Sequence, residues 1–161
     1  MIFAVDPGPD FCGVVSYEDA TTGTVFSCSA MSVWDAVIQV QMAARRGERI
    51  AIERVQSTGQ SGASLLRTSE TVGRLWQAGL SVGGSVTLVY RREVLRALDV
   101  TGKGNRDAMV RQRLLEMHGG SRAAACGNRA NPGVLYGVAG HSWQALGVAV
   151  AALHGAGEVV T

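Results

Sequence analysis

Two acidic residues of this chain each end a short apolar run. Asp6 follows Ile2-Phe3-Ala4-Val5 and is followed at once by Pro7-Gly8, while Glu53 follows Ile50-Ala51-Ile52. Short apolar runs bounded by turn signals are typical of buried strands. If the two strands are parallel neighbours, both carboxylates lie at the same edge of one sheet. Taken alone, Asp6 is equally compatible with a simple turn residue.

A pair of carboxylates at a sheet edge has a specific chemistry. Neighbouring carboxylates repel each other unless a hard divalent cation lies between them, and Mg²⁺ takes one or two carboxylates together with water and phosphate oxygens. The arrangement fits phosphoryl chemistry with two metal ions, one activating water and one stabilising the leaving oxygen. His141 and Gln144 open the last predicted helix and offer an imidazole nitrogen and an amide oxygen as further ligands. They are also compatible with ordinary polar residues at a helix start.

The elements that must position these residues follow from the apolar pattern. Three antiparallel strands are expected first, followed by two strands parallel to the first one and separated by helices, with right-handed crossovers. The result is an α/β domain with a mixed five-stranded sheet flanked by helices, formed by residues 1–161 as a single unit. The predicted strands cover residues 1–5, 11–17, 24–29, 49–53 and 86–90.

The helices are predicted from capping residues and near-helical apolar spacing. The first begins after the N-cap Ser32 and carries Trp34, Val37, Ile38 and Met42, and the last begins near His141, has Ser142 as its N-cap and buries Leu146, Val150 and Leu153. Residues 119–140, rich in Gly, Ala, Arg and Asn, are expected to be the least ordered segment. The remaining predicted helices cover residues 63–80, a short segment ending at Leu98, and a segment containing residues 109–117.

Composition limits the class of protein. The chain has 161 residues, of which 47% are hydrophobic and 17% charged, which indicates a globular domain with a real core. No run of about eighteen apolar residues and no signal peptide is apparent, so we expect a cytoplasmic protein without a membrane segment. The three cysteines have no C-x-x-C spacing, which argues against a disulfide framework and a zinc site.

The charge is unevenly distributed along the chain. Residues 1–53 contain seven acids and three Arg, whereas residues 54–161 contain twelve basic and six acidic residues. Fourteen of the fifteen basic residues are Arg, which binds phosphate oxygens well. Charge alone leaves nucleic acid binding and a solvated basic surface equally open.

Three motifs in order carry a family resemblance: Val5-Asp6-Pro7-Gly8, Ile50-Ala51-Ile52-Glu53, and His141-x-x-Gln144-Ala145-Leu146-Gly147. The chain resembles RuvC-type Holliday junction resolvases of the RNase H-like superfamily, including divergent phage-type members. The resemblance implies a homodimeric, Mg²⁺-dependent endonuclease, with Mn²⁺ as a substitute ion, that cuts four-way DNA junctions. It also implies that Asp6, Glu53, His141 and Gln144 form the catalytic and metal-binding site.

One departure from the family pattern concerns the last ligand. The family usually closes its site with an acid at the position of Gln144, so this chain loses one negative charge and is expected to hold a second Mg²⁺ more weakly. Asp10 and Asp107 are spare acids that could compensate.

Basic residues after the two parallel strands are expected to face DNA. Arg92, Lys103 and Arg106 fall where the family carries basic residues near the scissile phosphate, and the loop of residues 56–60 follows Glu53. The predicted DNA-binding residues are Arg54, Gln56, Arg91, Arg92, Lys103 and Arg106.

Other functions remain open at this point. A nuclease acting on flaps, forks or RNA, and a junction-binding protein with weakened catalysis, fit the same motifs. A phosphotransferase of the sugar-kinase and actin superfamily shares this sheet but needs a second lobe, for which 161 residues leave no room.

The dimer is expected to form through the helix of residues 63–80, since paired cuts across a two-fold junction are made most simply by two facing sites. Gly62, Ser69 and Gly73 keep one side of this helix thin, while Leu65, Leu66 and Trp76 supply apolar area. The alternative is that these residues simply pack on the sheet.

Overall fold

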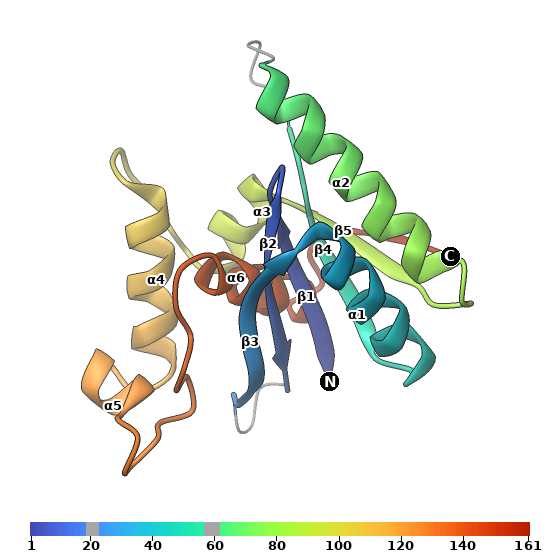
Figure 1. Ribbon diagram of the computed structural model, residues 1–161. Coiled ribbons are helices and arrows are strands. Elements are labelled where there is room, and N and C mark those ends of the chain that lie inside the picture. The colour runs from blue at the N-terminus through green and yellow to red at the C-terminus, as the bar shows by residue number, and fades with distance from the viewer. Residues whose placement is uncertain (19–22, 57–61) are drawn as a thin grey trace.

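The fold is built around one mixed sheet of six strands. The computed structural model describes residues 1–18, 23–56 and 62–161. The strand order is β3-β2-β1-β4-β5-β6, and Figure 1 labels β1 to β5. The strands are β1 (Ile2–Pro7), β2 (Phe11–Tyr17), β3 (Val25–Ser32), β4 (Arg49–Arg54), β5 (Val86–Tyr90) and β6 (Glu158–Val160).

The pairing of the strands confirms the predicted topology. β1, β2 and β3 form an antiparallel meander, and β1, β4 and β5 run parallel to one another. The carboxyl ends of these three parallel strands therefore lie at one edge of the sheet. The prediction of five strands was wrong by one, because β6 adds an antiparallel edge strand next to β5. Its three residues are too few to show an alternating pattern.

Helices cover both faces of the sheet (Figure 1). One face packs against α1 and α2 through side chains such as Phe3, Val5 and Ile52, and the other packs against α3, α4 and α6 through Ile2 and Ala4. Successive residues of β1 thus point to opposite cores, as the period of a strand requires. The helices are α1 (Val33–Arg45), α2 (Ala63–Leu80), α3 (Arg91–Ala97), α4 (Arg106–Met117), α5 (Arg122–Cys126) and α6 (Ser142–Leu153).

Helix α6 is the most deeply buried helix among the described residues. Ten residues of α6 between Ser142 and Ala152 are buried, including Leu146 and Val150 as predicted. Leu153 is half-buried. Gly147 lets α3 and α4 approach, since a Cβ there would lie 3.1 Å from Val94 and 3.3 Å from Val110. The helix is thereby fixed between the sheet and its two neighbours.

Helix α1 begins after its predicted N-cap, Ser32, whose hydroxyl accepts a hydrogen bond from the Asp35 amide. The helix buries Ala36, Val40, Ala43 and Ala44, and it exposes Trp34, Ile38 and Met42. The small residues of α1 face the sheet because they permit a close approach.

The start of α6 also differs from the prediction. His141, not Ser142, is the N-cap of this helix, and its side chain makes no capping hydrogen bond. Ser142 is buried, and its hydroxyl donates a hydrogen bond of 3.0 Å to the Ser29 carbonyl of β3. The hydroxyl therefore ties α6 to the sheet.

Residues 119–140 contain more structure than their composition indicated. Helix α5 lies here, Gly127 and Pro132 form an isolated bridge, and Leu135 is fully buried in the core beneath α6. Whether a single apolar residue such as Leu135 is buried depends on tertiary packing, which the local composition does not reveal.

No helix among the described residues has the length and apolar character needed to cross a lipid bilayer.

Candidate active site

The two acids predicted from the sequence come together at the carboxyl ends of the parallel strands. Val5 of β1 pairs with Ile52 of β4, so Asp6 and Glu53 are the next residue of each strand. Their side chains are 18% and 16% exposed. Parallel pairing alone thus places two carboxylates side by side in a largely buried position.

Burial makes the ionised forms of this pair unfavourable. Desolvation raises the pKa of Asp6 to about 7, against the attraction of Arg91. Desolvation, together with repulsion from Asp6, raises the pKa of Glu53 to about 7. The Oε2 atom of Glu53 is buried and makes no hydrogen bond to any of the described residues. A bound cation would supply the pair with further positive charge and with a contact for this oxygen.

Arg91 is the cation closest to this pair. It is the first residue of α3, directly after β5, and the helix starts there because the Tyr90 amide donates a 2.7 Å hydrogen bond to the Glu93 carboxylate. The Nη1 atom of Arg91 lies 3.7 Å from Oε2 of Glu53 and donates a 2.6 Å hydrogen bond to Oε1 of Gln144. Its Nη2 atom forms an ion pair with Asp107. The prediction that Arg91 faces DNA missed this role within the site.

His141 lies beside Asp6 on the outer side of the site. Its Nδ1 atom is 3.5 Å from Oδ2 of Asp6, and its side chain is 72% exposed. Gly13 of β2, which pairs with Asp6, makes this approach possible, because a Cβ at Gly13 would lie 2.4 Å from the His141 carbonyl oxygen. Sequence reasoning did not single out Gly13, although an isolated glycine within a strand is a signal of close backbone approach.

The spare acids have different positions. Asp10 forms an ion pair with Arg67 of α2 and is not part of the acid pair. Asp107, at the start of α4, reaches the site through Arg91. Asp107 thus joins the network of Asp6, Glu53, His141 and Gln144, and Asp10 lies outside it.

The residues present fit a divalent cation held mainly by two acids. Within residues 1–18, 23–56 and 62–161, no three His, Cys, Asp or Glu side chains form a ready metal cluster. Asp6 and Glu53 nevertheless supply two buried carboxylates with an unsatisfied oxygen, which are hard oxygen ligands of the kind that Mg²⁺ and Mn²⁺ prefer.

A hollow of about 440 Å³ lies beside His141 and Gln144, which flank the acid pair. His141, Trp143 and Gln144 form one wall, and the start of α4 forms the other. Arg111 lies over the Trp143 ring at 5.2 Å and lines this hollow. A polar wall with a guanidinium suits a phosphate or a nucleotide.

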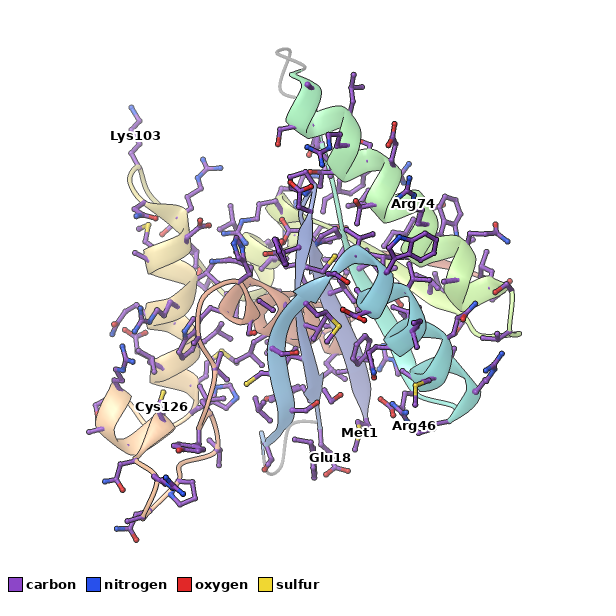
Figure 2. The ribbon with its side chains drawn as sticks, in the orientation of Figure 1. Met1, Glu18, Arg46, Arg74, Lys103 and Cys126 are labelled. Carbon is purple, nitrogen blue, oxygen red and sulfur yellow. The ribbon has the colours of Figure 1, made fainter. Side chains whose placement is uncertain are left out.

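The other predicted DNA-binding residues lie around the same edge of the sheet. Arg54 and Arg92 lie over the ring of Tyr90, at 5.3 and 4.8 Å from its centre, and Arg54 also pairs with Glu158 at 3.4 Å. Lys103 and Arg106 are exposed before and at the start of α4, and Figure 2 shows Lys103 at the outer tip of this segment. Gln56 is exposed, and residues 57–60 of the predicted DNA-binding loop lie outside the described residues.

Comparison with solved structures identifies the architecture. The structure of Thermus thermophilus RuvC matches with a TM-score of 0.62 and 19% identity, covering 99% of both chains. The chain has the fold of RuvC. A structure of T. thermophilus RuvC in complex with a Holliday junction substrate matches with a TM-score of 0.64 and 17% identity, covering 99% of this chain and 98% of that one. No protein-family model and no curated protein matches the sequence.

The RuvC likeness extends over the full length of the chain. It confirms the predicted α/β class and agrees, at the level of the fold, with the resemblance to RuvC. At 17–19% identity the likeness is one of fold, so the activity rests on the residues of the site itself.

Proposed function

We propose that this protein is a metal-dependent DNA endonuclease that resolves four-way junctions by paired phosphodiester hydrolysis. The observation that carries the proposal is the buried pair Asp6 and Glu53 at the carboxyl edge of a RuvC-fold sheet. The T. thermophilus RuvC structure with a Holliday junction supports branched DNA as the substrate class. The protein would act in the cytoplasm.

The roles of the residues follow from their positions. Asp6 and Glu53 would hold Mg²⁺ or Mn²⁺. His141 and Gln144, which the sequence predicted as further ligands, flank the pair, His141 beside Asp6 and Gln144 in contact with Arg91. Such an ion supplies charge for the phosphate and lowers the pKa of a bound water. His141 is exposed beside Asp6, where it can take a proton from the attacking water. Gly13 and Ser142 hold the backbone of this segment in place.

The DNA path follows the basic residues around this edge. The start of α2 and the segment with Lys103 project on the two sides of the strand ends (Figures 1 and 2). We assign backbone contacts to Arg54, Gln56, Arg92, Lys103 and Arg106, and Arg91 acts within the site. Affinity carried by such contacts falls steeply with salt.

A homodimer would place two such sites on two strands of one junction. On helix α2, a Cβ at Gly73 would meet no atom of the described residues within 4 Å, and Leu66 is 62% exposed. Trp76 packs against the core of the sheet and is not part of this surface. The exposed Trp34 and Ile38 of α1 extend the apolar area beside α2.

A second candidate is a junction-binding protein with weak catalysis. The observation that favours it is Gln144, which adds no negative charge and is bound by Arg91. A substrate panel separates the two, and it also tests flaps, forks and RNA.

The test compares nicking of a labelled four-way junction with that of flap, fork, linear duplex and RNA-containing substrates in Mg²⁺. The wild-type protein should cut the junction in pairs. Asp6→Asn should lower the rate at least about a hundredfold, because even residues that only support metal ligands change activity by about 10- to 100-fold. Binding of the junction should stay equal or become tighter, because a charge that repels phosphate is removed.

Asp10→Asn is the matched control, since this acid lies in the same hairpin and pairs with Arg67. It should retain full nicking. An Asp6→Asn protein with full activity would refute the assignment, and a wild type that binds junctions without cutting them would identify the binding protein.

A further inference from the structure

Arg91 is anchored within the site rather than being a surface residue that happens to lie near it. Its side chain is 25% exposed, and acceptors from three other elements surround it: Gln144 of α6, Asp107 of α4 and Glu53 of β4. The two guanidinium nitrogens have separate partners, Nη1 with Gln144 and Glu53 and Nη2 with Asp107. A forked, planar group held in this way has a fixed position.

The guanidinium changes the charge of the site permanently. Arginine stays protonated at any pH at which the protein is folded. Three carboxylates, from Asp6, Glu53 and Asp107, share the site with this one guanidinium, and Gln144 is neutral. When all three carboxylates are ionised, as metal binding requires, two negative charges remain uncompensated, and one divalent ion balances them.

Gln144 has a definite function in this arrangement. Its amide oxygen accepts the 2.6 Å hydrogen bond from Arg91 without adding a charge. An acid at this position would pair with the guanidinium or attract a further cation. The neutral amide adds no charge that would attract a further cation, and the oxygen that it would offer to a metal ion already accepts the hydrogen bond from Arg91.

We propose that Arg91 supplies the second positive charge of this site, so that the chain holds a single divalent ion, on Asp6 and Glu53, with Gln144 and Asp107 positioning the guanidinium. The inference rests on the proposed nuclease function and deepens it. It assigns Arg91 a positioning and charge-balancing role toward the scissile phosphate, in place of a contact with the DNA surface.

The first experiment counts ions without DNA. Calorimetry and electron paramagnetic resonance with Mn²⁺ alone measure the number bound per chain and their Kd. The wild-type protein should bind one Mn²⁺, and Asp6→Asn should abolish this binding. Two ions per wild-type chain would overturn the inference.

The second experiment changes the internal cation. Arg91→Gln should lower the Kd of the bound Mn²⁺ about tenfold or more, because a positive charge near the ion is removed. Arg91→Lys keeps the charge and should keep both the stoichiometry and the Kd. Arg91→Gln combined with Gln144→Glu should bind two ions. An unchanged Kd in Arg91→Gln, or a single ion in the double variant, would contradict the proposal.

Arg46→Gln is the control for loss of one positive charge. Arg46 follows α1, and Figure 2 shows it on the opposite side of the molecule from Lys103. It should leave the ion count and the Kd unchanged, and a Kd shift as large as that of Arg91→Gln would show a general charge effect and overturn the local role.

Junction cleavage, measured in parallel, separates the two hypotheses. If the wild type binds two ions and cleaves the junction, the charge-balancing role of Arg91 is refuted and the proposed nuclease function is supported. One bound ion without any cleavage refutes the proposed nuclease function and supports the charge-balancing role of Arg91. No bound ion refutes both hypotheses.

Discussion

Asp6 and Glu53 are protonated more readily in the folded chain than in water. Burial raises the pKa of each carboxyl to about 7, whereas both have ordinary values near 4 when the chain is unfolded. The folded protein without metal therefore holds protons that the unfolded chain releases between these values. The stabilising contribution is complete below about pH 4 and is lost as the pH rises toward and through about 7.

We predict that, in EDTA, the melting temperature falls as the pH is raised from 5 to 8. The slope is at most about 1.4 kcal/mol per pH unit for each group, which corresponds to several degrees for a domain of this size. Mn²⁺ at pH 8 should restore the loss, because it binds only the folded pair. Thermal melts of wild type and of a Glu53→Gln variant measure this, and an identical pH slope in both would contradict the assigned pKa of Glu53.

The acid pair could be predicted from the sequence, but the position of Arg91 within the site could not. Asp6 and Glu53 each end a buried run, and strand pairing then determines their positions. The partners of Arg91 are 16 and 53 residues away on α4 and α6. Such contacts depend on helix packing, for which no local pattern exists.

At the level of elements, β2 controls the position of the segment that carries His141. Gly13 lies where the backbone of residue 141 crosses the strand, and a Cβ would be only 2.5 Å from the His141 carbonyl carbon. Backbone cannot yield as a flexible side chain does. Any side chain here must push the start of α6 away from β1.

We predict that Gly13→Ala lowers the free energy of unfolding by roughly 1–3 kcal/mol, the usual cost of overpacking. It should also reduce nicking by more than its effect on junction binding, because His141 moves from Asp6. Gly73→Ala is the control for stability, since Gly73 lies within α2 and a Cβ there meets no atom of the described residues within 4 Å. Urea unfolding and cleavage rates measure both effects, and a Gly13→Ala protein with wild-type stability would show that the segment relaxes without cost.

Element types were easier to predict than the faces they bury. The near-helical apolar spacing of residues 63–80 and the apolar run of residues 86–90 were sufficient to predict helix α2 and strand β5. Helix α1 lies where it was predicted, but its large residues Trp34 and Ile38 face outward and its alanines face the sheet. A spacing rule assumes that the largest apolar residues are buried, and close packing on a sheet favours small ones.

At the scale of the whole molecule, the α1 and α2 face is the expected contact between two copies. A hollow of about 710 Å³ lies between these helices, lined by residues that include Trp34, Gly73 and Arg74. Neighbouring copies could fill it with the exposed side chains of the same face, as a two-fold contact requires.

We predict that Gly73→Trp converts a dimer to a monomer at micromolar concentration while the fold is retained, because the added ring has free space within one chain. Gln112→Trp on α4 adds the same bulk to an exposed position on the other side of the sheet and should stay dimeric. Analytical ultracentrifugation distinguishes the species. A wild type that is monomeric yet makes paired cuts in one binding event would refute the dimer.

The short strand β6 has a consequence for association between chains. A β-strand at a sheet edge offers unpaired backbone groups, onto which another chain can add a strand and begin aggregation. Here Glu158–Val160 covers β5, and Glu158 brings a charge that pairs with Arg54. A strand that adds at this edge of the sheet therefore finds only a short strand that carries a charged residue. The protein can carry a helical contact surface at high concentration without also exposing β5 to uncontrolled sheet extension.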